Sequence, residues 1–341
     1  MPRVVISGPD FIGTCASLAR GFEAYGWATS VHTWGDLPSG PLQRVRARLR
    51  SRRDGHLARN VDFVEVLRGR VIPDASSERT DLVVIVKPHG VDTSTVASLR
   101  RTGVPLAVWA TDSLERYPGQ TDLMENADLR YAMDDHDASA VAGSWLPLGF
   151  DDEIFAAVPE GEPRRHDVLF VGNLFRERYQ SRIRYFRALR ESEIARRYRV
   201  AFAGAALAGW SNRLGWMPGR VDWLGGGLPL VSLASAIARS RVCVNIHQDD
   251  GVQPVNPLFF AIPACGACMV TDEREYLGQW LESGVQFLPM GLDDLTDRLE
   301  AVLQSGDAVR IAQAGRQGAS QHTYKQRVAR MLTDLGFEAQ P

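Results

Sequence analysis

The sequence predicts an α/β protein made of two Rossmann-like domains, each a parallel sheet covered by helices. Three observations lead to this prediction. The chain has 341 residues, a length that favours two domains over one. Short apolar runs that end in glycine or polar residues alternate with helical patterns in both halves. Residues 156–166 (AAVPEGEPRRH) contain two prolines and mixed charges without periodicity, which is typical of a linker.

The composition is that of an ordinary globular protein, with 45% hydrophobic and 23% charged residues. The net charge of −2 gives no overall attraction to nucleic acid. Only Lys87 and Lys325 are lysines, so 39 − 2 = 37 basic residues are arginines, a bias expected of a GC-rich bacterial genome. The arginine-rich run from Arg44 to Arg59 lacks interleaved aromatic residues. We expect a solvated segment there, with a weak contact to an anionic surface as the alternative.

The four cysteines are expected to be structural thiols. A chain of this length does not need a disulfide framework, and the Cys265–Cys268 CxxC has no second pair that would complete a zinc site. We therefore expect no metal. No apolar stretch approaches the ~20 residues that span a bilayer, and the N-terminus runs directly into a strand. The sequence therefore predicts a cytoplasmic protein without a signal peptide.

The first half opens with a strand, residues 3–7, and a loop from Gly8 to Gly13 that contains Asp10. These glycines either let a ligand approach the backbone or make a tight strand–helix turn. The loop lacks the GxGxxG spacing, so a dinucleotide site is not supported.

Two further buried strands, residues 81–87 and 105–110, end in polar residues. They place Lys87, His89 and Asp112 at one edge of the sheet, where ligands of open α/β sheets bind. A lysine that closes an apolar strand is costly unless it is paired, which favours a functional role. The alternative role for Asp112 is that of a helix cap.

In the second half, the strand 167–171 is followed by Gly172, Asn173 and a helix with Arg176 and Arg178. Glycine permits a close backbone approach, and arginine binds phosphate oxygens in a bidentate manner. The alternative is that both arginines lie on the surface. Short strands over 199–203 and 222–224 and a helix over 231–240 follow.

Residues 241–272 predict a βαβ unit. A strand over 242–246 leads into a polar loop that starts at His247, and Asn256 with Pro257 opens a helix, since asparagine favours the N-cap and proline the first helical position. A second strand covers 267–270. The helix N-terminus presents N–H groups at the end of the strand, an arrangement that suits a phosphate or diphosphate.

These motifs resemble the donor-site segment of one glycosyltransferase family, named after the spore maturation protein CgeB. Its pattern is close to NIHxDD, GVN and xRxFEAxACGAxxxTD. The matching residues are Asn245-Ile246-His247, Gly251-Val252, Val255-Asn256, Ala264–Ala267 and Thr271-Asp272. Similar features elsewhere are the GPDFIG loop at 8–13, the DVxFVG strand at 167–172 and HTYxxRV at 322–328.

The resemblance implies the GT-B fold, in which two Rossmann-like α/β domains face a central cleft. Residues 1–155 are then the acceptor-side domain, 156–166 the linker, and 167–318 the donor-nucleotide domain. Residues 319–341 form a C-terminal helix that packs back on the first domain. The implied reaction moves a sugar from a nucleotide-diphosphate donor to an acceptor nucleophile on a small molecule, glycan or protein, without cofactor or metal. Secondary metabolism and envelope glycosylation are the implied settings.

The resemblance also implies the residues of the site. Those expected at the donor are Gly172, Asn173, Arg178, Trp223, His247, Val255, Asn256 and Lys87. Helix N–H groups together with arginine or lysine would stabilise the leaving diphosphate. An inverting reaction requires a base that deprotonates the acceptor, and the candidates are Asp10, Asp112 and His89. A retaining reaction does not require this base.

Two residues depart from the family pattern. Leu258 stands at its arginine position, and Ala261 replaces the helix acid that commonly binds the donor ribose. A missing charge-assisted hydrogen bond costs about 1.5–3 kcal/mol. Three explanations are open: another group binds the ribose, the donor carries 2′-deoxyribose, or the protein is not a catalyst. The alternative function is therefore a non-catalytic GT-B-type protein that binds a nucleotide, a glycan or a partner.

Overall fold

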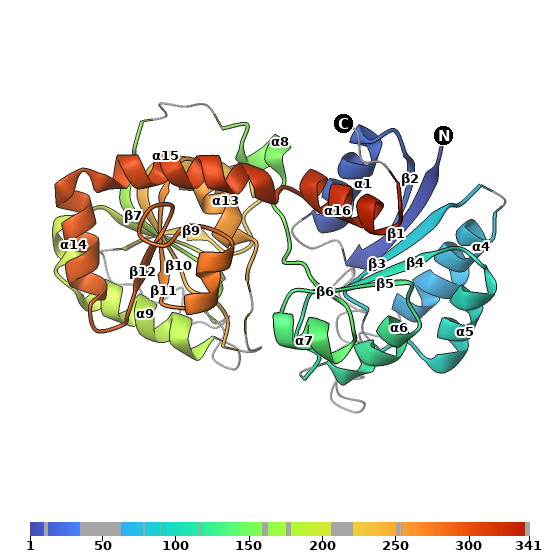
Figure 1. The fold of residues 1–341 in the computed structure, drawn as a ribbon. Coiled ribbons are helices and arrows are strands. Elements are labelled where there is room, and N and C mark those ends of the chain that lie inside the picture. The colour runs from blue at the N-terminus through green and yellow to red at the C-terminus, as the bar shows by residue number, and fades with distance from the viewer. Residues whose placement is uncertain are drawn as a thin grey trace, which may run out of the picture. The chain divides into compact units, whose positions relative to one another are not determined.

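The computed structural model describes residues 1–9, 13–34, 63–77, 79–88, 90–115, 117–158, 163–174, 179–205, 221–249, 253 and 255–337. The chain forms two compact units (Figure 1). The first unit consists of Met1–Leu148, Gly251–Gln253 and Tyr324–Pro341, and the second of Gly149–Asp250 and Pro254–Thr323. Each unit contains one six-stranded parallel sheet with its own helices.

The sheet of the first unit has the strand order β2-β1-β3-β4-β5-β6. Its strands are β1 (Arg3–Pro9), β2 (Ala28–Trp34), β3 (Leu82–Val86), β4 (Leu106–Ala110), β5 (Leu129–Ala132) and β6 (Ser144–Trp145). Its helices are α1 (Thr14–Ala24), α4 (Ile72–Ala75), α5 (Thr93–Arg101), α6 (Thr121–Glu125), α7 (Asp135–Ala140) and α16 (Tyr324–Asp334). A π-helical turn, η1 (Leu67–Val71), and a 3₁₀ turn, η2 (Pro118–Gln120), accompany them.

Helices cover both faces of this sheet, because alternate residues of β1 enter different cores. Val4 and Ile6 pack in one cluster with Phe22 of α1 and Val328 of α16, which lie side by side in Figure 1. Val5 packs in the other cluster, together with residues of η1, α4 and α5. This alternation follows from the two-residue period of a strand. It also explains why the central strands β3 and β4 are apolar along their whole length.

The sheet of the second unit has the strand order β12-β11-β10-β7-β8-β9. Its strands are β7 (His166–Val171), β8 (Val200–Ala203), β9 (Val221–Gly225), β10 (Ser240–Asn245), β11 (Cys268–Asp272) and β12 (Leu288–Met290). Its helices are α8 (Asp152–Phe155), α9 (Gln180–Glu191), α10 (Ile194–Arg197), α12 (Leu230–Ala238), α13 (Leu258–Ala264), α14 (Leu295–Ser305) and α15 (Asp307–Ala319). Two 3₁₀ turns, η3 (Glu275–Gln279) and η4 (Ser320–His322), complete it.

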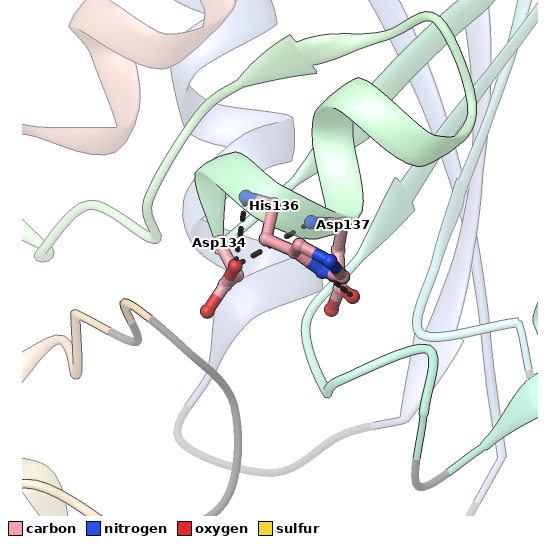
Figure 2. Close-up of side chains that lie close together, drawn as sticks. All are labelled: Asp134, His136 and Asp137. Carbon is pink, nitrogen blue, oxygen red and sulfur yellow. Dashed lines mark hydrogen bonds and ion pairs between the residues drawn. The ribbon is translucent and has the colours of Figure 1, made fainter.

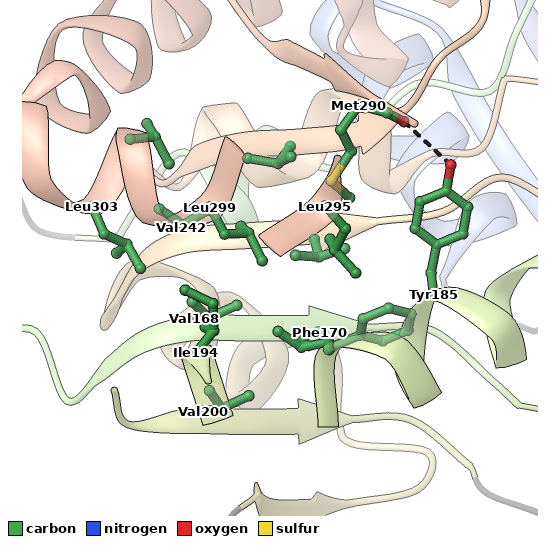
Figure 3. Close-up of a cluster of buried hydrophobic side chains, with 14 of the residues drawn as sticks. Val168, Phe170, Tyr185, Ile194, Val200, Val242, Met290, Leu295, Leu299 and Leu303 are labelled. Carbon is green, nitrogen blue, oxygen red and sulfur yellow. Dashed lines mark hydrogen bonds between the residues drawn. The ribbon is translucent and has the colours of Figure 1, made fainter. Parts of the chain in front are cut away.

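One face of the second sheet packs against α9 and α14 (Figure 3). Leu295, Leu299 and Leu303 recur every four residues along α14, so they share one side of that helix. At the edge of this core the Tyr185 hydroxyl donates to the Met290 carbonyl oxygen at 3.2 Å. Burial, with nearby negative charge, raises the pKa of Tyr185 to about 12.

The structure confirms the predicted α/β fold class, and most predicted strands agree within two or three residues. The four cysteines are free and buried. Burial raises the pKa of the Cys265 and Cys268 thiols to about 12. None of the described helices combines the length and apolar character needed to cross a membrane. The arginine run 44–59 lies outside the described residues.

Candidate functional site

The second sheet reverses its direction of growth between β7 and β10. From β7 the chain adds β8 and β9 on one side, and then crosses to β10, β11 and β12 on the other. Ligands of open α/β sheets bind outside the carboxyl ends of the strands at such a switch point. Val171 and Asn245 are register partners in the two strands. The residues that follow them, Gly172-Asn173 and Ile246-His247, therefore lie together there.

Arg182, in the first turn of α9, connects these two loops. Its Nε and Nη2 donate to the Ile246 carbonyl oxygen at 3.0 and 2.7 Å, and its Nη1 donates to the Asn173 carbonyl oxygen at 3.2 Å. The side chain is buried. Burial lowers the pKa of Arg182, but a guanidinium remains charged in proteins. Within the described ranges it has no ion-pair partner, so a buried positive charge lies at the switch point.

Gly172 makes room for Arg182. A Cβ atom at Gly172 would lie 3.0 Å from Cδ and Nε of Arg182, and its φ of 139° is one that other residues rarely adopt. A Cβ atom at Gly204 would lie only 2.1 Å from the Gly172 carbonyl oxygen. The glycines thus let the loops after β7 and β8 pack backbone to backbone beside the arginine. Asn173 fastens the same region, since its Oδ1 accepts from the Ala205 N–H at 2.9 Å.

His247 and Asp272 form a buried pair at the ends of β10 and β11. The backbone N and the Nδ1 of His247 each lie 2.9 Å from Asp272 Oδ1. Arg274 Nε donates to Asp272 Oδ2 at 2.6 Å. Burial alone would raise the pKa of Asp272, but the His247 hydrogen bonds and the Arg274 charge outweigh it and hold that pKa well below its usual range. Burial lowers the pKa of His247 despite the neighbouring carboxylate. The pair is therefore a neutral imidazole beside a carboxylate.

Asn256 fixes the beginning of α13. Its Oδ1 accepts from the Phe259 N–H at 3.2 Å, and its Nδ2 donates to Asn245 Oδ1 at 3.1 Å. The side chain thus caps the first turn and ties it to β10. Val255, just before it, is fully buried, and so is Ala261 within the helix.

Among the described residues expected at the donor, Trp223 is the most exposed, with 47% of its surface accessible. It lies in the edge strand β9, and its Nε1 donates to the Gly204 carbonyl oxygen at 3.1 Å. Arg178, which was also expected at the donor, lies outside the described residues.

The first sheet reverses between β1 and β3, and Lys87 directly follows β3. Lys87 has a φ of 56°, which is rare for a residue other than glycine. Its Nζ lies 3.3 Å from Asp112 Oδ2, with both side chains about one-fifth exposed (19% and 18%). The structure therefore brings Lys87 and Asp112 together as an ion pair. Asp10 and His89 lie outside the described residues.

Gly8 serves the packing of β1. A Cβ atom there would lie 2.9 Å from both Cys15 Sγ and Val86 Cβ. The sequence left two explanations for this glycine, a ligand close to the backbone or a tight strand–helix turn. The structure favours the second, because residues of α1 and β3 occupy the space beside Gly8.

Asp134, His136 and Asp137 gather at the start of α7 closely enough to surround a cation (Figure 2). Asp134 Oδ1, however, accepts the backbone N–H groups of His136 and Asp137 at 2.9 and 3.4 Å, which makes Asp134 a helix cap. Its Oδ2 accepts from the Gln253 N–H, and Asp137 Oδ2 accepts from the Leu114 N–H at 2.9 Å. Burial raises the pKa of Asp137. The carboxylates thus have backbone partners already, and the cluster is best explained as a cap.

Two important residues of this region were missed in the sequence. The sequence alone does not distinguish Arg182, because it is one of 37 arginines and lies inside an amphipathic helix. Asp272 was part of the family pattern but received no role. The signal that would have found both is spatial, since each bonds to a residue at the end of β10.

The second half of the chain matches a protein family in sequence. Residues 178–333 match the family described as glycosyl transferase-like. No curated protein matches the chain in sequence.

Solved structures match nearly the whole chain. Sucrose-phosphate synthase from Thermosynechococcus elongatus has a TM-score of 0.68 at 14% identity, covering 98% of this chain and 99% of that one. HepE from Anabaena, in complex with UDP and glucose, has a TM-score of 0.63 at 15% identity, covering 98% and 100%. An α-glucosyltransferase in complex with UDP and DNA has a TM-score of 0.66 at 9% identity, covering 98% of each chain. The chain therefore has the GT-B fold of these enzymes, with a glycosyl transferase-like segment at residues 178–333.

Proposed function

We propose that this protein is a CgeB-like glycosyltransferase that moves a hexose from a nucleotide-diphosphate donor to an acceptor nucleophile without a metal. The observation that carries the proposal is the buried guanidinium of Arg182 at the switch point of the second sheet. Three of its hydrogen bonds run to backbone carbonyl oxygens, and its Cζ lies 4.3 Å from the centroid of the Tyr179 ring. None of the described carboxylates forms an ion pair with it. A positive charge at the carboxyl ends of parallel strands favours an anionic ligand such as a diphosphate.

The chemistry of sugar transfer needs this charge. Cleavage of the bond between sugar and phosphate leaves the negative charge on the nucleoside diphosphate, and a fixed cation in a buried setting stabilises that charge as it develops. Arg182 also holds Asn173 and Ile246 in place, so the loops around the diphosphate are already ordered before it binds. Arg178 would add a second charge from the adjoining segment. This arrangement needs no metal ion.

Asn256 has a different role in this proposal from the one its motif first suggested. Both ends of its amide are bonded within the protein, to Phe259 and Asn245. It would therefore keep the start of α13 in position for the ligand rather than bind the diphosphate directly.

On the acceptor side, Asp112 is the candidate base that the structure describes. Its Oδ2 lies 3.3 Å from Nζ of Lys87, and a carboxylate can act as a general base. Asp10 and His89 remain the other candidates for an inverting reaction.

The test is a comparison of UDP, dTDP, GDP and ADP in thermal unfolding, followed by a release assay with the matching nucleotide sugars in EDTA. One diphosphate is expected to raise the melting temperature, because a ligand at 100 times its Kd stabilises by about 2.7 kcal/mol. UDP is the first probe, since HepE and the α-glucosyltransferase were solved with it. No shift with any diphosphate would refute the donor site. Binding without release of nucleoside diphosphate, across acceptors, would favour the non-catalytic alternative.

A further inference from the structure

Asn245 is the last residue of β10. The nitrogen of its side-chain amide has no hydrogen-bond partner among the described residues. The Phe259 N–H can only donate, so the oxygen of the Asn256 amide must face it. The Asn256 nitrogen then donates to the Asn245 oxygen. This fixes the orientation of the Asn245 amide, and its Nδ2 has no partner among the described residues. Asn245 is 1% exposed, so this donor is buried.

His247 follows two residues later, and its Nε2 also lacks a hydrogen-bond partner in the described part of the chain. The Asp272 carboxylate can only accept, so Nδ1 of His247 carries the proton that it donates. Nε2 is then a lone-pair acceptor. It too lacks a partner within the described part of the chain, and His247 is 0% exposed.

Both side chains face the beginning of α13. Asn245 bonds to Asn256, two residues before that helix, and the His247 ring lies 5.7 Å from the ring of Phe259 in its first turn. A buried polar group without a partner costs about 1–3 kcal/mol, and native proteins keep few of them. Here a buried donor and a buried acceptor, both without a partner among the described residues, lie at the end of β10, which borders the switch point. This pair requires an explanation.

We propose that Asn245 Nδ2 and His247 Nε2 form a hydroxyl-binding site, in which a ligand hydroxyl accepts from the first and donates to the second. A hydroxyl is suited to this because it both donates and accepts. A phosphate oxygen could satisfy only Asn245, and an ammonium group only His247. This inference rests on the proposed function, and the hydroxyl belongs to the ribose or to the transferred sugar of the donor.

The experiment measures affinity by calorimetry with two series of probes. The ribose arm compares UDP with 2′-deoxy-UDP and 3′-deoxy-UDP, and the sugar arm compares UDP-glucose with its singly deoxygenated analogues. The variants are Asn245→Asp, which keeps the oxygen that Asn256 needs but removes the N–H donor, and His247→Gln. His166→Gln is the control, because His166 is a half-buried histidine at the opposite, amino end of the same sheet.

The wild type and the control are expected to bind one deoxygenated probe about tenfold more weakly than its parent. In Asn245→Asp that difference should disappear, because the parent probe loses the same contact. Asn245→Asp also keeps the test valid if His247→Gln does not fold. For every probe, the loss of affinity relative to the parent compound could be the same in the wild type and in the variants. That result would overturn the hydroxyl site and would indicate that a structural water occupies it. If the wild type binds no probe at all, the proposed function fails and this inference fails with it.

Discussion

Replacing Arg182 with lysine separates the charge of this residue from its hydrogen-bond geometry. The planar guanidinium reaches two carbonyl oxygens from different loops, through three hydrogen bonds. A lysine ammonium keeps the positive charge but lacks the fork, so it can serve only one of the two loops. Hydrogen bonds to charged groups contribute about 1.5–3 kcal/mol each. Two of the Arg182 bonds share the Ile246 oxygen, so their loss is not additive. We expect Arg182→Lys to destabilise the protein by about 3 kcal/mol.

The measurement is urea unfolding followed by circular dichroism, with Arg187→Lys as the matched control. Arg187 lies on the exposed side of the same helix, where such a change is expected to stay within about 0.5 kcal/mol. UDP affinity should fall with Arg182→Lys even though the charge is kept, because the two loops lose their connection. Equal unfolding midpoints for the two variants would refute the view that Arg182 joins the loops.

Four further predictions concern the second unit. Because burial lowers the pKa of His247, the unfolded chain takes up a proton below pH ~6.5 that the folded chain does not, so acid destabilises the fold by up to about 1.4 kcal/mol per pH unit. His247→Gln should flatten the thermal stability profile between pH 6.5 and 5.0, and an unchanged slope would contradict this. Because the pKa of Asp272 is lowered in the folded protein, its contribution to the free energy of unfolding is complete above pH ~4. This contribution is lost only as the pH falls below that value. Gly204→Ala should cost more than about 3 kcal/mol in urea unfolding because of the backbone clash, whereas Gly278→Ala, with open space around it, should cost little. Finally, the Cys265 and Cys268 thiols, with pKa values of about 12, should resist iodoacetamide at pH 8 until the protein unfolds, as mass spectrometry can show.

The sequence was most informative where apolar runs are long. The prediction for residues 105–110 contains β4, and that for residues 81–87 contains β3. The shortest strands, β6 and β12, were not predicted, because two or three residues are too few to establish a period, and β12 contains Pro289. They owe their conformation to the neighbouring strands, and that information is not local.

The candidate site divides in the same way. Residues at strand ends, such as Lys87 and His247, were predictable because the topology of an α/β sheet places them at the ligand edge. Their partners were not predictable. The identity of the residue that fills the space beside Gly172 depends on how α9 packs, and Arg182 comes from a position with no distinguishing motif. The sequence therefore indicated that another group approaches the backbone at Gly172. It did not indicate that this group is a side chain of the protein, namely Arg182.

The packing of α16 against α1 has a consequence for the synthesis of the protein. A Cβ atom at Gly21 would lie 2.9 Å from Cγ2 of Val328, and Arg327 Nε donates to the Pro147 carbonyl oxygen at 2.7 Å. The first unit is thus completed by α16, the last helix that the structure describes. Ribosomes add about 5–20 residues per second, so the 323 − 148 = 175 residues between these parts take roughly 9–35 s to emerge. During that interval the apolar cluster around Phe22 lacks the residues that α16 contributes, such as Val328. The second unit can therefore finish folding before the first. The nascent chain therefore offers chaperones an apolar surface on α1, and this surface is covered only when α16 has been synthesised.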